Sequence, residues 1–216
     1  IYGLELEDLL SPNRIKFLYH KNTLVEEHIA GIPGDVFLEE YLPLPETNKI
    51  RIAKEFVKFN ERCFARLLGD MRSYNFVIDI TPDIEDYQYR MRAIDFDQQS
   101  YEGRKNLYLT QFYRKNYEYV ELVLKTLSPE VIKQYQMEEQ SAMAYRAVAS
   151  RKQLMELLSI MIKDELSEYH KIKMLREELN EHFQTSYFST CSTMGTIVKR
   201  QLKLVLQKHL QQIVTG

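Results

Sequence analysis

The stretch RLLGDMRSYNFVID, residues 66–79, interrupts a regular pattern of apolar residues with a Gly-Asp corner and a lone asparagine, Asn75. A second apolar run, RAIDFDQQ at residues 92–99, also ends in carboxylates. Carboxylates at the ends of apolar elements are costly, because desolvation disfavours a charge. The pattern therefore marks Asp70, Asn75 and Asp95 as candidates for a functional role.

The residues around this stretch have the periodicity of one long helix and two strands. Apolar residues recur at helical spacing from residue 46 to residue 68, with Thr47 as the expected N-cap and Gly69 as the expected end. Strands are expected at residues 75–80 and 89–94. The acidic loop between them lacks the glycine and the terminal glutamate of a calcium loop, which indicates an ordinary solvated connection.

The N-terminal part of the chain has the pattern of a β-hairpin. Residues 14–20 and 23–29 are β-branched and aromatic runs parted by the polar pair Lys21-Asn22. A Gly/Pro break follows, and residues 35–42 then predict one or two helical turns.

After Gly103 the sequence predicts only helices. Helical periodicity covers residues 104–127, 129–150, 151–183 and 194–214, and the last of these is expected to dock on the others. The sequence therefore predicts an α+β fold with a small strand-containing N-terminal part and a large, mainly helical C-terminal part.

Composition narrows the classes of protein to consider. The 216-residue chain carries 29 Lys and Arg against 31 Asp and Glu, so its net charge of −2 gives no reason to expect a nucleic-acid partner. Cys63 and Cys191 have neither metal-ligand nor disulfide-framework spacing, which favours a reducing, cytoplasmic location. No signal peptide and no apolar run long enough to cross a bilayer is visible, so no membrane span is expected.

Asp70 and Asn75 stand five residues apart in GDMRSYN, and IDFD places Asp95 directly before Phe96 at the end of a predicted strand. This order resembles the catalytic loop and the metal-binding Asp-Phe-Gly element of the protein-kinase-like superfamily. The motif style is similar to that of aminoglycoside and choline phosphotransferase-like small-molecule kinases. The resemblance covers residues 14–100 and implies a protein-kinase-like fold.

The resemblance implies ATP- and magnesium-dependent phosphoryl transfer to a hydroxyl acceptor. Asp70 would act as the base or orient the acceptor hydroxyl, and Arg72 would contact the transferring phosphoryl group. Asn75 and Asp95 would be ligands of Mg²⁺. The acceptor is expected to be a small molecule rather than a protein, and these motifs do not specify which one.

The stretch TLVEEHIAGIPGDVFL, residues 23–38, resembles the kinase hinge. The resemblance implies that the backbone of Glu27 and Ile29 faces the adenine of ATP. It also implies two parts of the chain: residues 1–30 as the edge of the smaller lobe with the hinge strand, and residues 31–216 as the larger helical lobe.

The sequence departs from the kinase pattern in three ways. Leu68 occupies a position that is usually His or Arg, and Asp97 replaces the glycine of the metal motif. No glycine-rich loop and no lysine-bearing strand precede the predicted hairpin, so the smaller lobe either lies upstream of Ile1 or is missing in a degenerate relative. The alternative functions are therefore a non-catalytic kinase-like scaffold or a helical protein-interaction domain, in which Asp70 would only cap a turn and Asp95 a helix.

Overall fold

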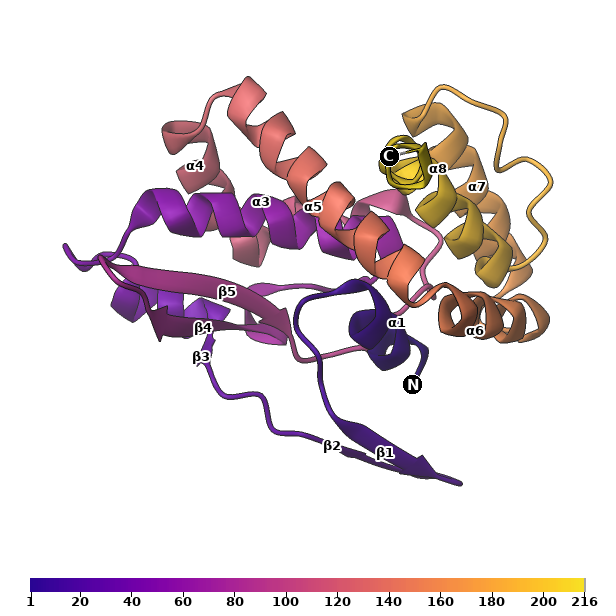
Figure 1. The fold of residues 1–216 in the computed structure, drawn as a ribbon, viewed down its shortest axis with the longest axis horizontal. Coiled ribbons are helices and arrows are strands. Elements are labelled where there is room, and N and C mark those ends of the chain that lie inside the picture. The colour runs from indigo at the N-terminus through magenta and orange to yellow at the C-terminus, as the bar shows by residue number, and fades with distance from the viewer. Residues whose placement is uncertain (216) are drawn as a thin grey trace.

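The computed structural model describes residues 1–215, with side chains through residue 213, and is an α+β structure in which helices predominate (Figure 1). The helices are α1 (Tyr2–Leu10), α2 (Gly34–Val36), α3 (Lys49–Arg66), α4 (Tyr117–Thr126), α5 (Pro129–Ala149), α6 (Arg151–Lys163), α7 (Tyr169–His182) and α8 (Met194–Thr215). The strands are β1 (Phe17–His20), β2 (Thr23–Glu26), β3 (Ile32–Pro33), β4 (Phe76–Pro82) and β5 (Tyr87–Ala93). The predicted α+β class and the mainly helical C-terminal part are confirmed.

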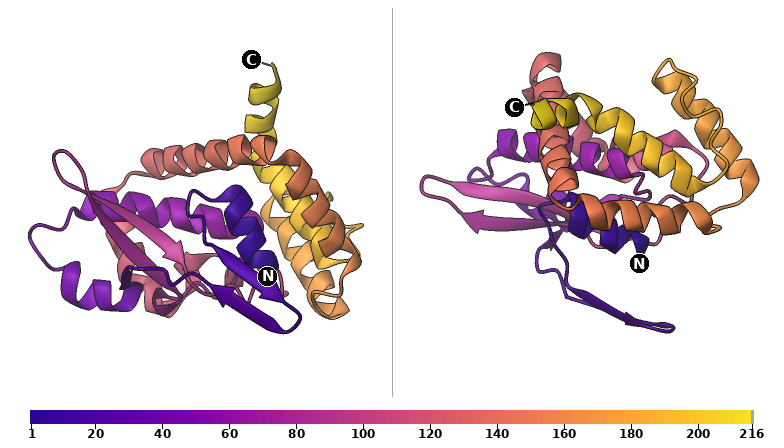
Figure 2. Two further views of the ribbon diagram at one scale, coloured as in Figure 1. Left: turned by 60° about the horizontal axis from the view of Figure 1, so that its bottom comes forward. Right: turned by 45° about the vertical axis from the view of Figure 1, so that its right-hand side comes forward.

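The strands form two separate antiparallel sheets. β1 and β2 pair in the register that sets Phe17 opposite Glu26, which confirms the predicted hairpin. Side chains on both strands are mostly exposed, and the hairpin projects away from the helices (Figure 1 and the right-hand view of Figure 2). The second sheet has the order β3-β4-β5, with Phe76 opposite Ala93, and it confirms the two strands predicted on either side of the acidic loop.

Helix α3 contributes to both apolar cores of the protein. It packs against β5 and buries Ile52, Phe56 and Phe59 in the core next to the three-stranded sheet. Its last turn contributes Phe64 and Ala65 to a second core, formed mostly by the C-terminal helices. The apolar residues of α3 therefore pack into one core along most of the helix and into the other core at its last turn.

The ends of α3 differ from the prediction. Asn48 is the N-cap, because its side chain accepts a hydrogen bond from the Arg51 N–H at 3.2 Å, whereas the predicted Thr47 lies one residue too early. At the C-terminus Leu67, rather than Gly69, takes the left-handed conformation, with φ 57°. The Leu67 side chain is fully buried, so its packing offsets the backbone cost that usually selects glycine there.

The predicted helix over residues 104–127 is wrong in its first half. Residues 105–116 form three short 3₁₀ turns, and only α4 is α-helical. The Asn116 side chain contributes to the difference, because its amide donates to the Thr110 carbonyl of this segment at 2.7 Å and to the Met71 carbonyl outside it at 2.8 Å. A side chain that engages a main-chain carbonyl in this way competes with helical hydrogen bonding.

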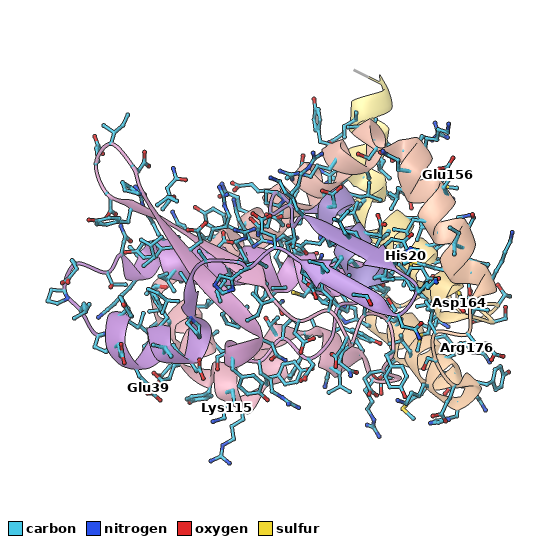
Figure 3. All side chains as sticks on the ribbon, turned by 90° about the horizontal axis from the view of Figure 1, so that it is seen from below. His20, Glu39, Lys115, Glu156, Asp164 and Arg176 are labelled. Carbon is cyan, nitrogen blue, oxygen red and sulfur yellow. The ribbon has the colours of Figure 1, made fainter. Side chains whose placement is uncertain are left out.

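The predicted helical segment 151–183 consists of two helices, α6 and α7, with a break at residues 164–168. Asp164, labelled in Figure 3, begins this break and accepts a hydrogen bond from the Tyr2 hydroxyl at 2.8 Å. A contact with a distant element thus replaces a further helical turn.

Helix α1 is an element that the sequence pattern does not predict. It buries Leu6, Leu9 and Leu10 among the C-terminal helices and packs against α5 and α6. The first 30 residues therefore hold a helix that belongs to the helical core as well as the projecting hairpin. A division of the chain at residue 30 stays a prediction.

Helix α8 docks on α5 and α6, as the sequence predicts, and buries Ile197, Val198 and Leu202. None of the helices within residues 1–215 combines the length and the apolar character that a bilayer span requires.

Two arginines of α3 are buried together with carboxylate partners. Arg66 is 2% exposed and forms an ion pair with the equally buried Glu7 of α1. Arg62 pairs with Glu55 at 2.6 Å and with Glu139 of α5 at 3.3 Å. Burial alone would lower the pKa of Arg62, but the charges of Glu55 and Glu139 raise it, so the guanidinium stays protonated. These pairs join α1 and α5 to α3.

We expect Glu7→Gln to lower the free energy of unfolding by about 3–5 kcal/mol, because it leaves Arg66 buried without a counter-charge. Glu5→Gln, on the same helix and in no ion pair among the described residues, should change it by less than about 0.5 kcal/mol. The double variant Glu7→Leu/Arg66→Met should recover most of the loss, since no charge then remains buried. Urea unfolding of the four proteins measures this, and a Glu7→Gln midpoint equal to that of Glu5→Gln would contradict it.

Candidate functional site

The chain makes a tight corner after α3 that holds Asp70 in a half-buried position. Asp70 is left-handed, with φ 56°. Its N–H donates to the Tyr113 hydroxyl at 2.9 Å and to the Leu107 carbonyl at 3.3 Å, and the same Leu107 carbonyl accepts from Tyr113. A left-handed non-glycine residue costs about 1–3 kcal/mol and persists only where its surroundings fix it. The segment 105–113 supplies that support.

Asn75, at the other end of the loop that begins at Asp70, is hydrogen-bonded back to Asp70. Its side-chain Nδ2 donates to the Asp70 carbonyl at 2.7 Å and lies 3.4 Å from Asp70 Oδ2. Its main-chain carbonyl accepts from the Ile94 N–H at 3.1 Å. The loop is therefore joined to the end of β5, the strand that leads to Asp95.

Arg72 places a positive charge directly beside Asp70. Its Nε lies 3.0 Å from Asp70 Oδ1, and its Nη1 donates to the Tyr74 hydroxyl at 2.7 Å. The guanidinium carbon also lies 5.5 Å from the centroid of the Tyr113 ring. Three groups thus orient a side chain that is still partly open to solvent.

Asp95 and Asp97 lie on a turn directly after β5. The Asp97 N–H donates to Asp95 Oδ1 at 3.1 Å, so Asp95 organises this turn and not the start of a helix. The Gly69 N–H donates to the Gln98 carbonyl at 3.2 Å, which ties the turn to the corner that holds Asp70.

The carboxylates of the two segments influence one another. Burial raises the pKa of Asp70, Arg72 opposes this rise, and the charges of Asp95 and Asp97 add to it. Burial and the charge of Asp95 likewise raise the pKa of Asp97. Convergence of carboxylates that disfavour one another's ionised form creates a place that attracts a cation.

The carboxylate turn rests on α1 and on the end of α3. The Arg66 guanidinium carbon lies 5.8 Å from the centroid of the Phe96 ring. Gly3 of α1 comes so close that a Cβ on it would stand 2.8 Å from the Phe96 Cβ. Gln99 Nε2 donates to the Arg66 carbonyl at 2.6 Å. The buried Glu7–Arg66 pair therefore lies beside the segment that carries the carboxylates.

The structure brings together four of the predicted site residues, namely Asp70, Arg72, Asn75 and Asp95. In the sequence Asp97 is only a departure from the metal motif, whereas in the structure its N–H donates to Asp95 Oδ1 and the charge of Asp95 helps to raise the pKa of its carboxyl. The signal that could have found it is the second carboxylate of IDFD, two residues after the first.

Glu27 and Ile29 lie in the segment after β2, and no hydrogen bond or ion pair within the described residues joins them to the carboxylates. The Glu27 N–H donates to the Lys16 carbonyl at 2.8 Å. In the part of the chain that the structure describes, the Glu27 carbonyl and the Ile29 N–H make no hydrogen bond. Both groups remain available to a ligand, and their role as adenine contacts stays a prediction.

The oxygen atoms of the site suit a hard divalent cation, but ligands from outside the protein would have to complete its coordination. Within residues 1–215 no group of three or more His, Cys, Asp or Glu side chains is placed to hold a metal ion. Asp95 and Asp97 offer carboxylate oxygens. The hydrogen bond from Asn75 to Asp70 uses Nδ2, which leaves the side-chain Oδ1 of Asn75 as a further oxygen donor. Oxygen donors of this kind suit Mg²⁺, which usually completes its shell with water and with phosphate oxygens of a substrate.

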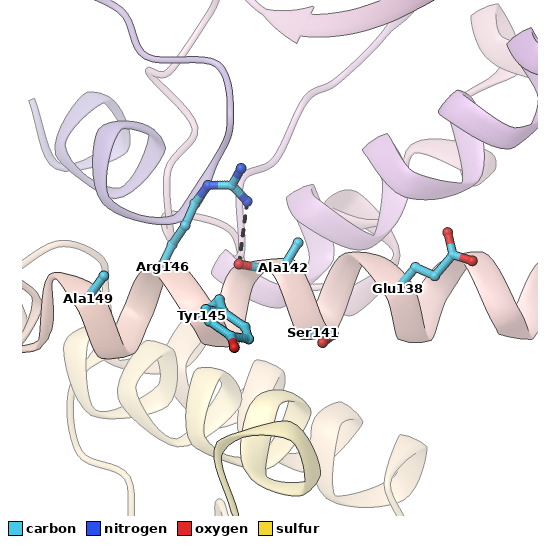
Figure 4. A pocket seen from close by; sticks show the side chains of 6 residues that line it. All are labelled: Glu138, Ser141, Ala142, Tyr145, Arg146 and Ala149. Carbon is cyan, nitrogen blue, oxygen red and sulfur yellow. Dashed lines mark hydrogen bonds between the residues drawn. The ribbon is translucent and has the colours of Figure 1, made fainter. Parts of the chain in front are cut away.

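A hollow elsewhere on the surface lacks comparable chemistry. Figure 4 shows that the side chains lining it all come from α5: Glu138, Ser141, Ala142, Tyr145, Arg146 and Ala149. The one interaction drawn there runs from Arg146 Nη1 to the Ala142 carbonyl of its own helix, at 3.4 Å. Groups from separate elements do not converge in it, unlike those around Asp70.

Comparison with models of known protein families, with curated proteins and with solved structures finds no match to this chain.

We expect the stability difference between Asp70→Asn and the wild type to depend on pH. The folded-state pKa of Asp70 lies above its ordinary value of 3.8, so the stability that this carboxyl contributes is present below that value and is lost as pH rises through the folded-state pKa. Asn does not titrate, so the variant should gain stability relative to the wild type between about pH 4 and about pH 7.

Asp83→Asn is the matched control with the opposite sign. The hydrogen bond from Gln88, the Ile84 N–H and Arg51 lower the pKa of Asp83, so its contribution is present above its ordinary pKa and is lost as pH falls. This variant should therefore lose stability relative to the wild type as pH rises. Urea unfolding at the two pH values measures both differences, and equal pH dependence of the two variants would contradict the assignment for Asp70.

Proposed function

We propose that this protein is a kinase-like phosphotransferase that binds ATP with Mg²⁺ and transfers a phosphoryl group to a hydroxyl of a small-molecule acceptor. One observation carries the proposal: Asp70, Arg72, Asn75 and the pair Asp95 and Asp97 converge from two short segments of the chain. Catalysis of phosphoryl transfer depends almost entirely on positioning and on the placement of charge, which this arrangement can supply.

Asp70 suits the role of a group that orients or deprotonates the acceptor hydroxyl. Its backbone is fixed by Tyr113 and Asn75, and its raised pKa makes it a better proton acceptor near neutral pH than an ordinary aspartate. Arg72, at 3.0 Å from the carboxylate, suits a contact to an equatorial oxygen of the transferring group, where a fixed positive charge stabilises developing negative charge.

Asp95, Asp97 and the Oδ1 atom of Asn75 are the groups of this chain that would hold Mg²⁺. When bound, the ion would neutralise charge on the nucleotide phosphates. The open carbonyl of Glu27 and the open N–H of Ile29 are consistent with backbone pairing to adenine.

The alternative functions, a non-catalytic scaffold and a helical interaction domain, would keep part of the same geometry. The bond from Asn75 to the Asp70 carbonyl and the turn at Asp95 are local structure that a scaffold also needs. Asn can replace Asp in such a turn at little cost, whereas it removes the charge of a magnesium ligand. This difference separates the functions by experiment.

In the intact protein, ATP with Mg²⁺ should raise the melting temperature in a concentration-dependent way, and omission of Mg²⁺ should weaken the rise. Asp95→Asn and Asp97→Asn should each abolish the magnesium-dependent part of the rise without lowering the melting temperature of the protein without ligand. Asp83→Asn, on the exposed turn between β4 and β5, should keep the full ATP- and magnesium-dependent rise, whatever its melting temperature without ligand. No rise in the wild type with either form of ATP would favour the interaction domain.

Asp70→Asn tests the chemical step. With an acceptor found by screening hydroxyl compounds for ADP release, this variant should bind ATP as the wild type does and turn over about 10²- to 10⁴-fold more slowly. Undiminished turnover would remove Asp70 from the mechanism. Magnesium-dependent ATP binding without ADP release in the presence of any acceptor would favour the scaffold.

A further inference from the structure

A second hollow, of about 760 Å³, is lined by residues of α3, α5, α8, the end of α7 and the 3₁₀ segment at residues 105–112. Its walls combine the aromatic rings of Phe64, Phe112 and Phe183, the last directly after α7, with the carboxylate of Glu61 and the amide of Gln140. We refer to it as the Glu61 cleft.

Glu61 is a buried carboxylate for which the described residues supply no counter-ion. Its side chain is 5% exposed, and its one hydrogen bond is accepted from Gln140 Nε2 at 2.8 Å. No Lys, Arg or His within the described residues forms an ion pair with it. The neighbouring guanidinium of Arg62 is engaged by Glu55 and Glu139. A buried charge of this kind is costly unless a partner compensates it.

The groups around Glu61 disfavour its ionised form. Burial raises the pKa of Glu61, the hydrogen bond from Gln140 opposes the rise, and the charge of Glu139 adds to it. Lys105 is a cation that also lines the cleft, but its Nζ lies 3.5 Å from His182 Nδ1 and in no ion pair with Glu61. A cation that enters the cleft would therefore meet an unpaired carboxylate.

The cleft continues into an apolar hollow next to it. The two share Asn60, Gln111, Phe112 and Gln136, and the second adds apolar side chains from α3, α4 and α5 such as Val57. The polar groups, namely Glu61, Lys105, His182 and four side-chain amides, line the cleft itself, and the neighbouring hollow is lined mainly by apolar side chains. A bound molecule can thus place an apolar body against the apolar walls of the hollow while one end reaches the carboxylate, which is the division between apolar walls and polar anchors that small-molecule sites use.

We propose that the Glu61 cleft binds an organic cation, a primary ammonium group carried on an apolar body, with the ammonium paired to Glu61. Aromatic faces add to the recognition of a cation, and the pair gains strength where water is excluded. This site is separate from the one around Asp70. Tyr113 contacts Asp70, whereas Lys105 and Phe112 of the same segment line the cleft.

The probe is 2-phenylethylammonium chloride, with 2-phenylethanol as the uncharged analogue and 3-phenylpropanoate as the anionic one. Isothermal titration of the intact protein should show binding of the ammonium compound, with the alcohol at least about 10-fold weaker and the anion weaker still. Glu61→Gln should weaken binding of the ammonium compound by about 10-fold or more and leave binding of the alcohol unchanged. Glu121→Gln, an exposed change of the same charge on α4, should leave all three affinities as they are.

Without ligand, Glu61→Gln should have a higher melting temperature than the wild type, because it removes a buried charge that has no partner. The proposal is overturned if the wild type does not bind the ammonium compound, or if the alcohol binds as tightly. It is equally overturned if Glu61→Gln binds the ammonium compound as the wild type does. Binding of the ammonium compound only in Lys105→Gln would identify Lys105 as the partner of Glu61 in solution and would also reject the proposal.

Discussion

The structure depends on the burial of Arg66 at the C-terminal end of α3. A guanidinium that is 2% exposed requires a counter-charge, and Glu7 supplies it from a segment almost sixty residues away. This pair fixes α1 against α3, and α1 in turn brings Gly3 against Phe96. A cation near the last turn of a helix is also favoured by the helix dipole. One electrostatic requirement therefore connects the N-terminal helix, the central helix and the carboxylate turn.

The candidate site begins at a corner where the backbone conformation is unfavourable by itself. Leu67 and Asp70 are both left-handed within four residues, which local sequence alone disfavours. The packing of Leu67 and the hydrogen bonds of Tyr113 and Asn75 offset this cost. Strain held by surrounding structure at a cluster of polar side chains is typical of functional sites, because it fixes geometry before a ligand arrives.

The 3₁₀ segment at residues 105–116 has two roles that a regular helix could not combine. Leu107 and Tyr113 hold the Asp70 backbone, while Lys105 and Phe112 line the Glu61 cleft. The Asn116 side chain contributes to its irregular course, because it takes up the Thr110 carbonyl and ties the segment to the Met71 carbonyl. The phosphotransfer proposal and the cation proposal therefore concern different sets of residues, but the two sites share one supporting segment.

Local pattern was sufficient for the hairpin, for the body of α3, for the pair β4 and β5, and for the positions of Asp70 and Asp95 at their ends. Those features depend on periodicity and turn chemistry within short windows of sequence. The local sequence pattern did not predict α1, the end of α3 at Leu67, or the absence of an α-helix directly after residue 104. These depend on contacts between residues far apart in the chain, and the buried pair Glu7–Arg66 is the clearest of them. Such contacts leave no periodic trace in the sequence, because each partner alone looks like an ordinary charged residue of a helix.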